Sequence, residues 1–287
     1  MDDRSPQGII WLASYPRSGN TWIRVFLTNL RRIIDGQDAA LDLDSMDPAV
    51  ALWDNEAALY NRLLGKPVST ATGQEIMRAR SWVLAQLAED AGGLLLMKTH
   101  NANVMFGGFA TVPPSLSAGA IYVVRNPLDC IISCAEFWNI SLDEAIGRAA
   151  QSGAMLTGDA ENRRIFTLMG SWSENVSTWT ALASPALLVV RYEDLLDRPT
   201  ESFGAIAAHL RMNHTVAHLS EAIEQSSFRR LQDIEGKRGF HERPESAARF
   251  FREGRKQQWR ERLTPAQVDR VVAAHGDQMS KFGYLPG

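Results

Sequence analysis

The chain has 287 residues, of which 45% are hydrophobic and 22% are charged, as in an ordinary globular protein. A formal net charge of −3 argues against a general nucleic-acid-binding protein. No apolar run approaches the ~18 residues that a membrane span requires, and residues 1–8 lack the basic start and apolar stretch of a secretory signal. We therefore expect a cytoplasmic protein with no membrane span and no nucleic-acid partner.

Four continuously apolar runs, each ending abruptly in polar residues, predict strands that are buried on both faces, as in a parallel sheet. They are residues 9–13, 94–97, 120–124 and 186–190. Helical patterns lie between and after them, at residues 22–34, 172–182, 200–210 and 264–282, and a further helix is expected to start at Asn126. Because strands alternate with helices, we predict the α/β class: one domain over residues 1–287, with a parallel sheet flanked by helices.

The two cysteines, Cys130 and Cys134, are four residues apart on the predicted helix that starts at Asn126. A disulfide between them would close a very short loop and constrain little, so we expect buried free thiols. No cysteine and histidine cluster has the spacing of a zinc site, and we expect no metal.

Charge is unevenly spread along the chain. Residues 229–262 contain 11 Lys/Arg against 6 Asp/Glu, a local +5, and the remainder is therefore about −8, since −3 minus 5 is −8. Such a segment is either a solvated surface or a cover over a small polyanion, and both interpretations stay open here.

The ends of the predicted strands carry polar groups, among them Arg17, Lys98, His100 and Arg125. In open parallel sheets ligands bind beyond the carboxyl ends of the strands, so these four side chains are expected to converge on one anionic ligand.

Residues 14–22 follow the first strand and open the first helix. Gly19 allows a tight turn, the helix start offers backbone N–H groups, and Arg17 adds a charge. Ser18, Asn20 and Thr21 supply further donors. The segment outlines a phosphate-binding loop, but it lacks the Gly-Lys-Ser/Thr of a magnesium-dependent P-loop, and a turn that binds nothing would look similar.

This loop resembles the Tyr-Pro-Lys-Ser-Gly-Thr-Thr-Trp loop of sulfotransferases that use 3'-phosphoadenylyl sulfate (PAPS). Four further segments resemble the same family in the same order: residues 98–100, residues 122–133, residues 170–172 with 191–194, and residues 251–254 with Trp259. The core motifs thus run from about residue 9 to 264. The resemblance implies a P-loop-like 5'-phosphosulfate-binding loop and a sulfotransferase that moves a sulfuryl group from PAPS to a hydroxyl of a small organic acceptor, leaving PAP.

The resemblance also implies roles for individual residues. His100 is the expected general base of an in-line transfer, because neutral imidazole has a pKa near ~6.5. Lys98 and Arg17 are expected to stabilise the transferring group. Arg17 stands where most members have lysine, so it keeps the charge but cannot donate a proton.

For the nucleotide, the resemblance implies that Arg125 and Ser133 bind the 3'-phosphate and that residues 229–262 cover the cofactor. Glu253 departs from the family's lysine, and Arg255 or Lys256 is a candidate to compensate. Trp22, Tyr192 and Phe228 match adenine-contacting positions. The full cofactor-binding set is Arg17, Ser18, Gly19, Asn20, Thr21, Trp22, Arg125, Ser133, Tyr192, Ser226, Phe228, Arg252, Glu253 and Gly254.

The acceptor is left open among phenols, glycolipids, sugars and peptide antibiotics. Residues 34–90 and 101–117 are expected to build its pocket, with contributions from Phe137, Trp138 and residues 147–167. The family's dimerisation motif has Thr-Val where this chain has Thr264-Pro265, so that mode of dimerisation is not expected, and the oligomeric state stays open.

Two other functions compete with this one. A kinase or nucleotidase acting on ATP would need magnesium and a Gly-Lys-Ser/Thr loop. A PAPS- or PAP-binding module without catalysis is the second alternative, and the presence of both His100 and Lys98 argues against it.

Overall fold

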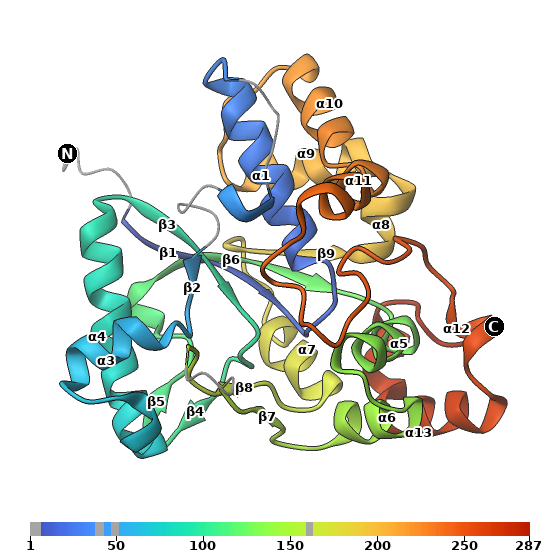
Figure 1. Cartoon of the computed structure of the whole chain (residues 1–287), viewed down its shortest axis with the longest axis horizontal. Coiled ribbons are helices and arrows are strands. Elements are labelled where there is room, and N and C mark those ends of the chain that lie inside the picture. Colours follow the sequence, from blue (N-terminus) through green and yellow to red (C-terminus); the bar gives the residue numbers. More distant parts are fainter. Residues whose placement is uncertain (1–6, 38–42, 47–51, 159–162) are drawn as a thin grey trace. The chain divides into compact units, whose positions relative to one another are not determined.

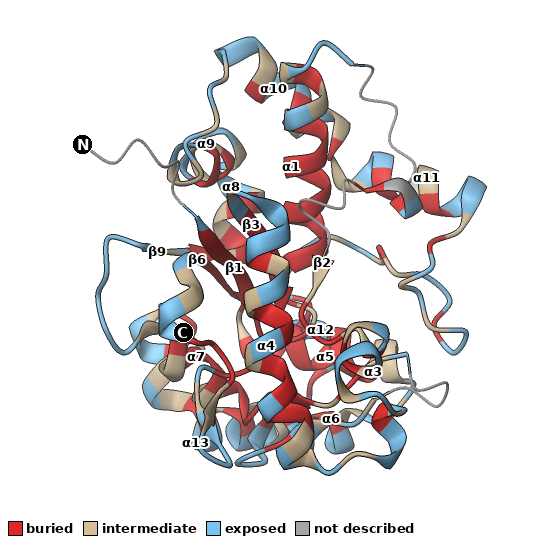
Figure 2. Ribbon diagram, turned by 90° about the vertical axis from the view of Figure 1, so that its left-hand side faces the viewer, coloured by how far each residue is buried: buried red, intermediate tan, exposed pale blue. Residues whose placement is uncertain are grey.

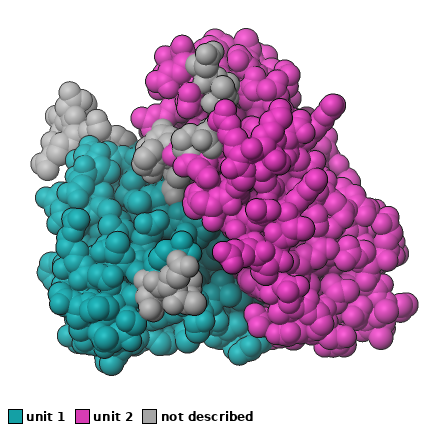
Figure 3. Space-filling model, viewed as in Figure 1, with its two compact units in different colours: residues 1–15, 51–122, 151–189 teal, residues 16–50, 123–150, 190–287 magenta. Residues whose placement is uncertain are grey.

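The computed structural model describes residues 7–37, 43–46, 52–158 and 163–287 (Figure 1). The chain forms two compact units that are interleaved in sequence, and each is described by itself. Unit 1 comprises residues 1–15, 51–122 and 151–189, and unit 2 comprises residues 16–50, 123–150 and 190–287 (Figure 3). The predicted single domain over residues 1–287 stays a prediction.

A five-stranded sheet in the order β2-β3-β1-β6-β9 is the centre of the fold. Its strands are β1 (Gly8–Ser14), β2 (Leu52–Trp53), β3 (Leu94–Thr99), β6 (Ser117–Val124) and β9 (Leu187–Arg191). Strand β3 pairs in parallel with β1 and with β2. All four predicted strands are present, because continuously apolar runs are stable only where both faces of a strand are covered. The short edge strand β2 was not predicted.

In unit 1 the long helix α4 (Gly73–Ala91) packs against β1 and β3. It begins at a capping box in which the side chains and main chains of Thr72 and Glu75 bond reciprocally. Helix α7 (Trp172–Thr180) starts at a second capping box, made by Ser171 and Glu174. The unit also contains α3 (Ala57–Leu64), η2 (Val68–Thr70), η3 (Pro114–Leu116), β4 (Met105–Phe106), β5 (Phe109–Ala110), β7 (Met155–Leu156) and β8 (Thr167–Leu168).

In unit 2 helix α1 (Asn20–Ile34) is buried over most of its length (Figure 2), because it packs against α9 (Pro199–His209) and α10 (Val216–Gln225). Helix α5 (Pro127–Trp138) starts as predicted: the Asn126 side chain accepts a hydrogen bond from the Leu128 N–H at 3.0 Å. The other helices are η1 (Leu43–Ser45), α6 (Leu142–Ala150), α8 (Tyr192–Asp197), α11 (Phe228–Arg238), α12 (Trp259–Arg262) and α13 (Pro265–Lys281).

The predicted α/β class, with a parallel sheet flanked by helices, is confirmed. Cys130 and Cys134 are free and buried, as expected. Of the predicted acceptor segment 34–90, residues 38–42 and 47–51 lie outside the described residues, as do residues 159–162 of segment 147–167. Among the helices that the structure describes, none is both long enough and apolar enough to cross a membrane.

His275 on α13 makes part of the stability depend on pH. Its side chain is 2% exposed, and burial lowers the pKa of His275 from 6.5 to about 4. The unfolded chain therefore binds more protons than the folded chain between these values, so this contribution is complete above pH 6.5 and is lost as the pH falls towards 4.

We expect wild-type protein to lose about 2 kcal/mol more unfolding free energy than the His275→Gln variant between pH 7.5 and pH 5. Urea unfolding of both proteins at the two pH values measures the difference. Equal losses in the two proteins would show that His275 is not held neutral by the fold.

Candidate active site

The predicted phosphate loop, residues 14–22, follows β1, and its residues from Pro16 onwards belong to unit 2. Arg17 and Gly19 adopt positive φ angles of 64° and 104°, and α1 begins at Asn20 directly after them. A Cβ atom on Gly19 would lie 2.7 Å from Cδ2 of Tyr192, which no real contact allows. Glycine at this position thus permits both the left-handed turn and the close approach of the Tyr192 ring.

The guanidinium of Arg17 is held at a fixed place beside this loop. It lies over the rings of Phe137 and Phe250, with Cζ 4.6 Å and 4.4 Å from their centroids. Its Nε donates to Oγ of Ser133 at 3.1 Å, and its Nη2 donates to the Phe250 carbonyl at 2.8 Å. Burial and the charge of Arg125 lower the pKa of Arg17 to about 10, so the group stays cationic at neutral pH.

Arg125 lies beside Arg17. Its Nη1 donates to the Arg17 carbonyl at 2.9 Å, and its Cζ lies 4.3 Å above the Tyr192 ring. The residue is 6% exposed, and in the part of the chain that the structure describes its buried Nε has no hydrogen-bond partner. A buried donor of this kind is costly unless an acceptor reaches it, and a phosphate oxygen is the acceptor that a guanidinium binds best.

The residues predicted to contact adenine form one cluster around Trp22. The ring of Trp22 lies edge-on to those of Tyr192 and Phe228, with centroids 5.8 Å and 6.4 Å apart. Its Nε1 donates to the Ser226 carbonyl at 2.7 Å, and the Ser226 hydroxyl accepts from Asn29 at 3.0 Å. Segments far apart in sequence therefore meet at one aromatic cluster.

Gly254 brings the C-terminal motif to the same cluster. Its φ is 60°, and a Cβ atom there would lie 2.3 Å from Cγ of Phe228. The neighbouring guanidinium of Arg252 is engaged by the carboxylates of Glu136 and Glu253. Its predicted phosphate contact would have to compete with these ion pairs.

Glu253, which departs from the family's lysine, is balanced by arginines. It pairs with Arg252 and with Arg255, and Arg255 also bonds Glu261 at 2.9 Å. Lys256 is directed to Asp197 instead. Arg255 and Lys256 were the two candidates to compensate for the negative charge of Glu253, and of these two Arg255 contacts it.

Two carboxylates fasten the predicted cover segment 229–262. Asp129 at the start of α5 accepts from the N–H groups of Gln257 and Trp259 at 2.6 Å and 3.0 Å. Glu235 on α11 accepts from the Phe250 N–H at 2.6 Å. The segment is basic in composition, but its main chain is held by buried acids.

Glu242 is a third acid, which our sequence analysis did not identify. Its carboxylate, 3% exposed, accepts from Nη2 of Arg24 at 2.7 Å and 2.8 Å and from Oγ1 of Thr21 at 3.2 Å. The predicted phosphate donor Thr21 is therefore engaged by a carboxylate. The arginine within the apolar pattern of α1 was the sequence signal for a buried anionic partner.

Lys98 and His100 belong to unit 1, at the carboxyl end of β3. Nδ1 of His100 lies 2.7 Å from the Ser14 carbonyl oxygen. Because a carbonyl can only accept, Nδ1 carries the proton, and in the neutral ring the lone pair is on Nε2. The Nζ atom of Lys98 lies 3.0 Å from the centroid of the Trp53 ring.

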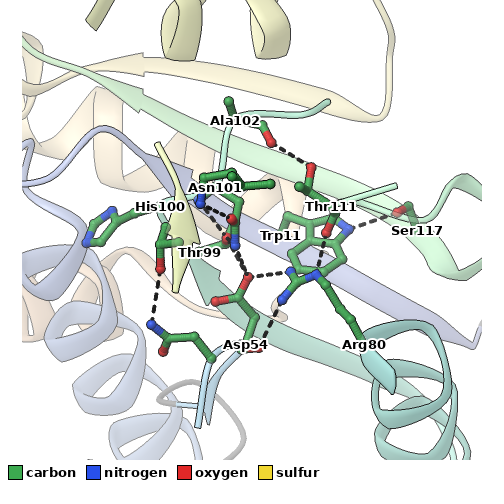
Figure 4. A network of polar contacts seen from close by, with 12 residues as sticks. Trp11, Asp54, Arg80, Thr99, His100, Asn101, Ala102, Thr111 and Ser117 are labelled. Atoms are coloured by element: carbon green, nitrogen blue, oxygen red, sulfur yellow. Dashed lines mark hydrogen bonds and ion pairs between the residues drawn. The ribbon is translucent and has the colours of Figure 1, made fainter. Parts of the chain in front are cut away.

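A buried network around Asp54 fixes the residues on either side of His100 (Figure 4). Its Oδ2 accepts from Arg80 at 2.5 Å, from Thr99 at 2.6 Å and from Asn101 at 2.9 Å. Asn175 donates to the His100 carbonyl at 3.1 Å. The imidazole points away from the network (Figure 4), so the main chain is held while the ring faces another direction.

The structure therefore brings together, within unit 2, the groups predicted for the nucleotide, and it holds Lys98 and His100 within unit 1. The convergence of both sets on one ligand stays a prediction. The contacts of Asp54, Trp53 and Phe250 gave no sequence signal, because they depend on strand pairing and on turns. Trp53 was expected only as part of the acceptor-pocket segment 34–90. Among the described residues no three His, Cys, Asp or Glu side chains gather as metal ligands.

A parallel α/β sheet whose first strand leads through a glycine turn into a helix defines the class of enzymes that bind phosphate groups at a helix start. The family described as the sulfotransferase domain matches residues 7–283. The chain therefore belongs to the sulfotransferase family and is a transferase.

Relatives and solved structures agree with this assignment. The chain is similar to "Cytosolic sulfotransferase 15" of Arabidopsis thaliana, with 22% identity covering 98% of this chain and 74% of the relative. It is 25% identical to "Sulfotransferase 2A2" of Mus musculus, covering 96% of each chain. Its fold is similar to mouse sulfotransferase SULT7A1 complexed with PAP, with a TM-score of 0.59, 17% identity and coverage of 95% and 84%. It is also similar to retinol dehydratase in a complex with retinol and PAP, with a TM-score of 0.64, 15% identity and coverage of 96% and 82%.

Replacing Gly254→Ala is expected to lower the free energy of unfolding by about 1–3 kcal/mol, because the added methyl group meets Phe228 and the positive φ becomes strained. Urea unfolding measures the loss. Gly236→Ala on α11 is the matched control, since nothing lies within 4 Å of its Cβ position, and we expect no loss there. An unchanged free energy of unfolding in the Gly254→Ala variant would contradict the close packing of Gly254 against Phe228.

Proposed function

We propose that this enzyme transfers the sulfuryl group of PAPS to a hydroxyl of a small organic acceptor. The observation that carries the proposal is the buried Arg125, whose Nε has no acceptor among the described residues, beside Arg17, Ser133 and the Tyr192 ring. This arrangement suits an adenosine that bears two phosphate groups. The PAP complexes of similarly folded proteins support the same donor.

In the proposed binding of PAPS, the positive groups and backbone N–H groups hold the phosphates, and the aromatic rings contact the adenine. Arg125 and Ser133 would hold the 3'-phosphate, which distinguishes PAPS from AMP and ATP. Gly19 and the first turn of α1 would hold the 5'-phosphate with backbone N–H groups. The rings around Trp22 offer faces and edges to the adenine, and such stacking is worth ~1–3 kcal/mol per base. PAPS supplies a sulfuryl group on a good leaving phosphate.

His100 is proposed as the general base. The hydrogen bond from Nδ1 to the Ser14 carbonyl fixes the tautomer in which Nε2 can take the proton of an acceptor hydroxyl. Because the carbonyls of Ser14 and His100 are both in hydrogen bonds, the ring has a defined orientation before the acceptor binds.

Lys98 and Arg17 are proposed to stabilise the negative charge that develops on the leaving phosphate. With a pKa of about 10, Arg17 keeps its proton at neutral pH and acts by charge. A lysine at this place could in addition release a proton, so Arg17 removes that option from this chain.

The acceptor-binding groups are proposed to come from the segments 34–90 and 101–117. Their described parts include α3, α4 and the β4–β5 hairpin, where Met105 and Phe106 are 65% and 37% exposed. Exposed apolar side chains of this kind favour an acceptor with an apolar or aromatic part. We further propose a cytoplasmic protein, as the names of the cytosolic relatives suggest.

The donor is tested by thermal unfolding with PAP, and with ATP in the presence and absence of magnesium. A ligand at 100 times its Kd raises the unfolding free energy by about 2.7 kcal/mol. Stabilisation by PAP without magnesium is expected, and stabilisation by magnesium-ATP alone would favour a kinase or nucleotidase. A screen of hydroxyl compounds with [35S]PAPS then identifies the acceptor.

Replacing Arg125→Met is expected to weaken PAP binding by about 10-fold to 100-fold, because a charged hydrogen-bond partner of the phosphate is lost. Calorimetry with PAP and with AMP, which lacks the 3'-phosphate, measures the effect. The affinity for AMP should change little. An equal loss for both nucleotides would contradict the assignment of Arg125 to the 3'-phosphate.

Replacing His100→Ala is expected to lower turnover by at least about 100-fold, as loss of a general base does. PAP affinity, which depends on unit 2, should be retained. Single-turnover transfer of 35S from PAPS to the acceptor found in the screen gives the rate. Undiminished transfer would exclude His100 as the base.

A further inference from the structure

The ammonium group of Lys98 rests on an indole ring. Lys98 is 5% exposed, and its Nζ lies 3.0 Å from the centroid of Trp53. The two residues are Cα partners in the parallel pairing of β2 and β3, so their side chains project from the same face of the sheet. The contact follows from the register of the edge strand.

Trp53 is held by a main-chain hydrogen bond of the residue that follows it and by a second cation on its ring. On the main chain, the N–H of Asp54 donates to the Lys98 carbonyl at 3.3 Å, and the Asp54 side chain projects to the other face, where it binds Thr99. On the ring, Cζ of Arg164 lies 3.4 Å from the same centroid. Two cations this close to one centroid have room only on opposite faces, so the indole lies between Lys98 and Arg164.

Arg164 is fixed by main-chain pairing with the residues after β2. The Ala57 N–H donates to the Arg163 carbonyl at 2.8 Å, and the Ile165 N–H donates to the Asn55 carbonyl at 2.8 Å. Its Nη1 also donates to Oδ1 of Asn55 at 3.3 Å. The sandwich of Lys98, Trp53 and Arg164 is thus built from three strand-like segments of unit 1.

An aromatic ring binds a cation in a different way from that in which a carboxylate binds it. The ring attracts the ammonium through its quadrupole but leaves the full positive charge in place. A flexible lysine side chain would otherwise sample many rotamers. A group that must stabilise charge developing in a transition state benefits from being held in one place before the reaction.

We propose that Trp53 is a positioning residue that holds the Lys98 ammonium for sulfuryl transfer, with Arg164 bracing the opposite face of the ring. The role of Lys98 belongs to the proposed function, on which this inference rests. Trp53 does not touch the reacting atoms in this proposal. It acts through Lys98 alone.

The contact is tested first without any measurement of activity. The chain has five lysines, Lys66, Lys98, Lys237, Lys256 and Lys281, so 13Cε-lysine labelling gives five methylene signals. The Lys98 signal is assigned by its absence in Lys98→Arg. We expect its Hε protons to be shifted upfield by the indole ring current and to return to ordinary values in Trp53→Leu, while the other four signals stay in place. An ordinary Lys98 shift in the wild type would overturn the proposal.

The role in transfer is tested by a double-mutant cycle on conversion of PAPS to PAP and sulfate, with water as the acceptor. In this step the bond from sulfur to the 5'-phosphate oxygen breaks, a bond from sulfur to the water oxygen forms, and a proton is released. We expect Trp53→Leu to lower the single-turnover rate about 10-fold to 100-fold, as small misplacements of catalytic groups do. Trp53→Phe, which keeps an aromatic face, should restore most of the rate.

In the Lys98→Met background, Trp53→Leu should have almost no further effect, because the group that it positions is gone. Circular dichroism and urea unfolding serve as the check that each variant is folded. If Trp53→Leu costs the same factor in both backgrounds, its role is structural and the proposal is wrong. If the wild-type chain converts no PAPS and sulfates no acceptor, the proposed function fails, and the NMR result still decides whether the contact exists.

Discussion

The end of strand β3 depends on one buried carboxylate. Asp54 follows the edge strand β2, and its Oδ2 accepts hydrogen bonds from an arginine on α4, from Thr99 and from Asn101. Taking a carboxylate out of water is costly, and this one is stabilised by three donors, one of which, Arg80, forms an ion pair with it. Lys98 and His100 lie on either side of Thr99, so the main chain that carries both is held by the hydrogen bonds of Asp54 to Thr99 and Asn101. The chemistry proposed for this strand end needs that rigidity.

In unit 2 the guanidinium groups of Arg17 and Arg125 lie close together, so their mutual repulsion must be offset by other contacts. Arg17 is stabilised by two phenylalanine rings, and Arg125 lies over a tyrosine ring. Arg24, by contrast, is paired with the Glu242 carboxylate. Cations on ring faces keep their charge, whereas those in ion pairs are balanced. Arg17 and Arg125, which we assign to phosphate, thus keep their charge, whereas the charge of Arg24 is balanced.

Sequence patterns were sufficient for the four longer strands of the sheet and for helices α1, α5, α7, α9 and α13, because continuous apolar runs, caps and glycines report local geometry. The long helix α4 was not predicted. Asn126 caps α5 as its neighbours suggest. The edge strand β2 was not predicted, since two residues carry no periodicity, and neither were the contacts of Trp53 with Lys98 and of Asp54 with Thr99. Arg24 within the apolar pattern of α1 indicates that a buried anionic partner exists, but Glu242 lies far away in sequence and nothing local identifies it as that partner. Residues whose roles arise from tertiary register are therefore the ones that sequence reasoning missed.

The interleaving of the two units bears on how the chain folds during synthesis. Unit 1 is complete once residue 189 has left the ribosome, whereas unit 2 needs residues up to 287, which is 98 residues later, since 287 minus 189 is 98. At about 5–20 residues per second, this gap lasts roughly 5–20 s. For that time the β3 end with its lysine and histidine can already be formed, while α1 and α5 still await the helices that bury them. Newly made chains would therefore expose the apolar face of α1, and a chaperone that binds nascent polypeptides would find its target there.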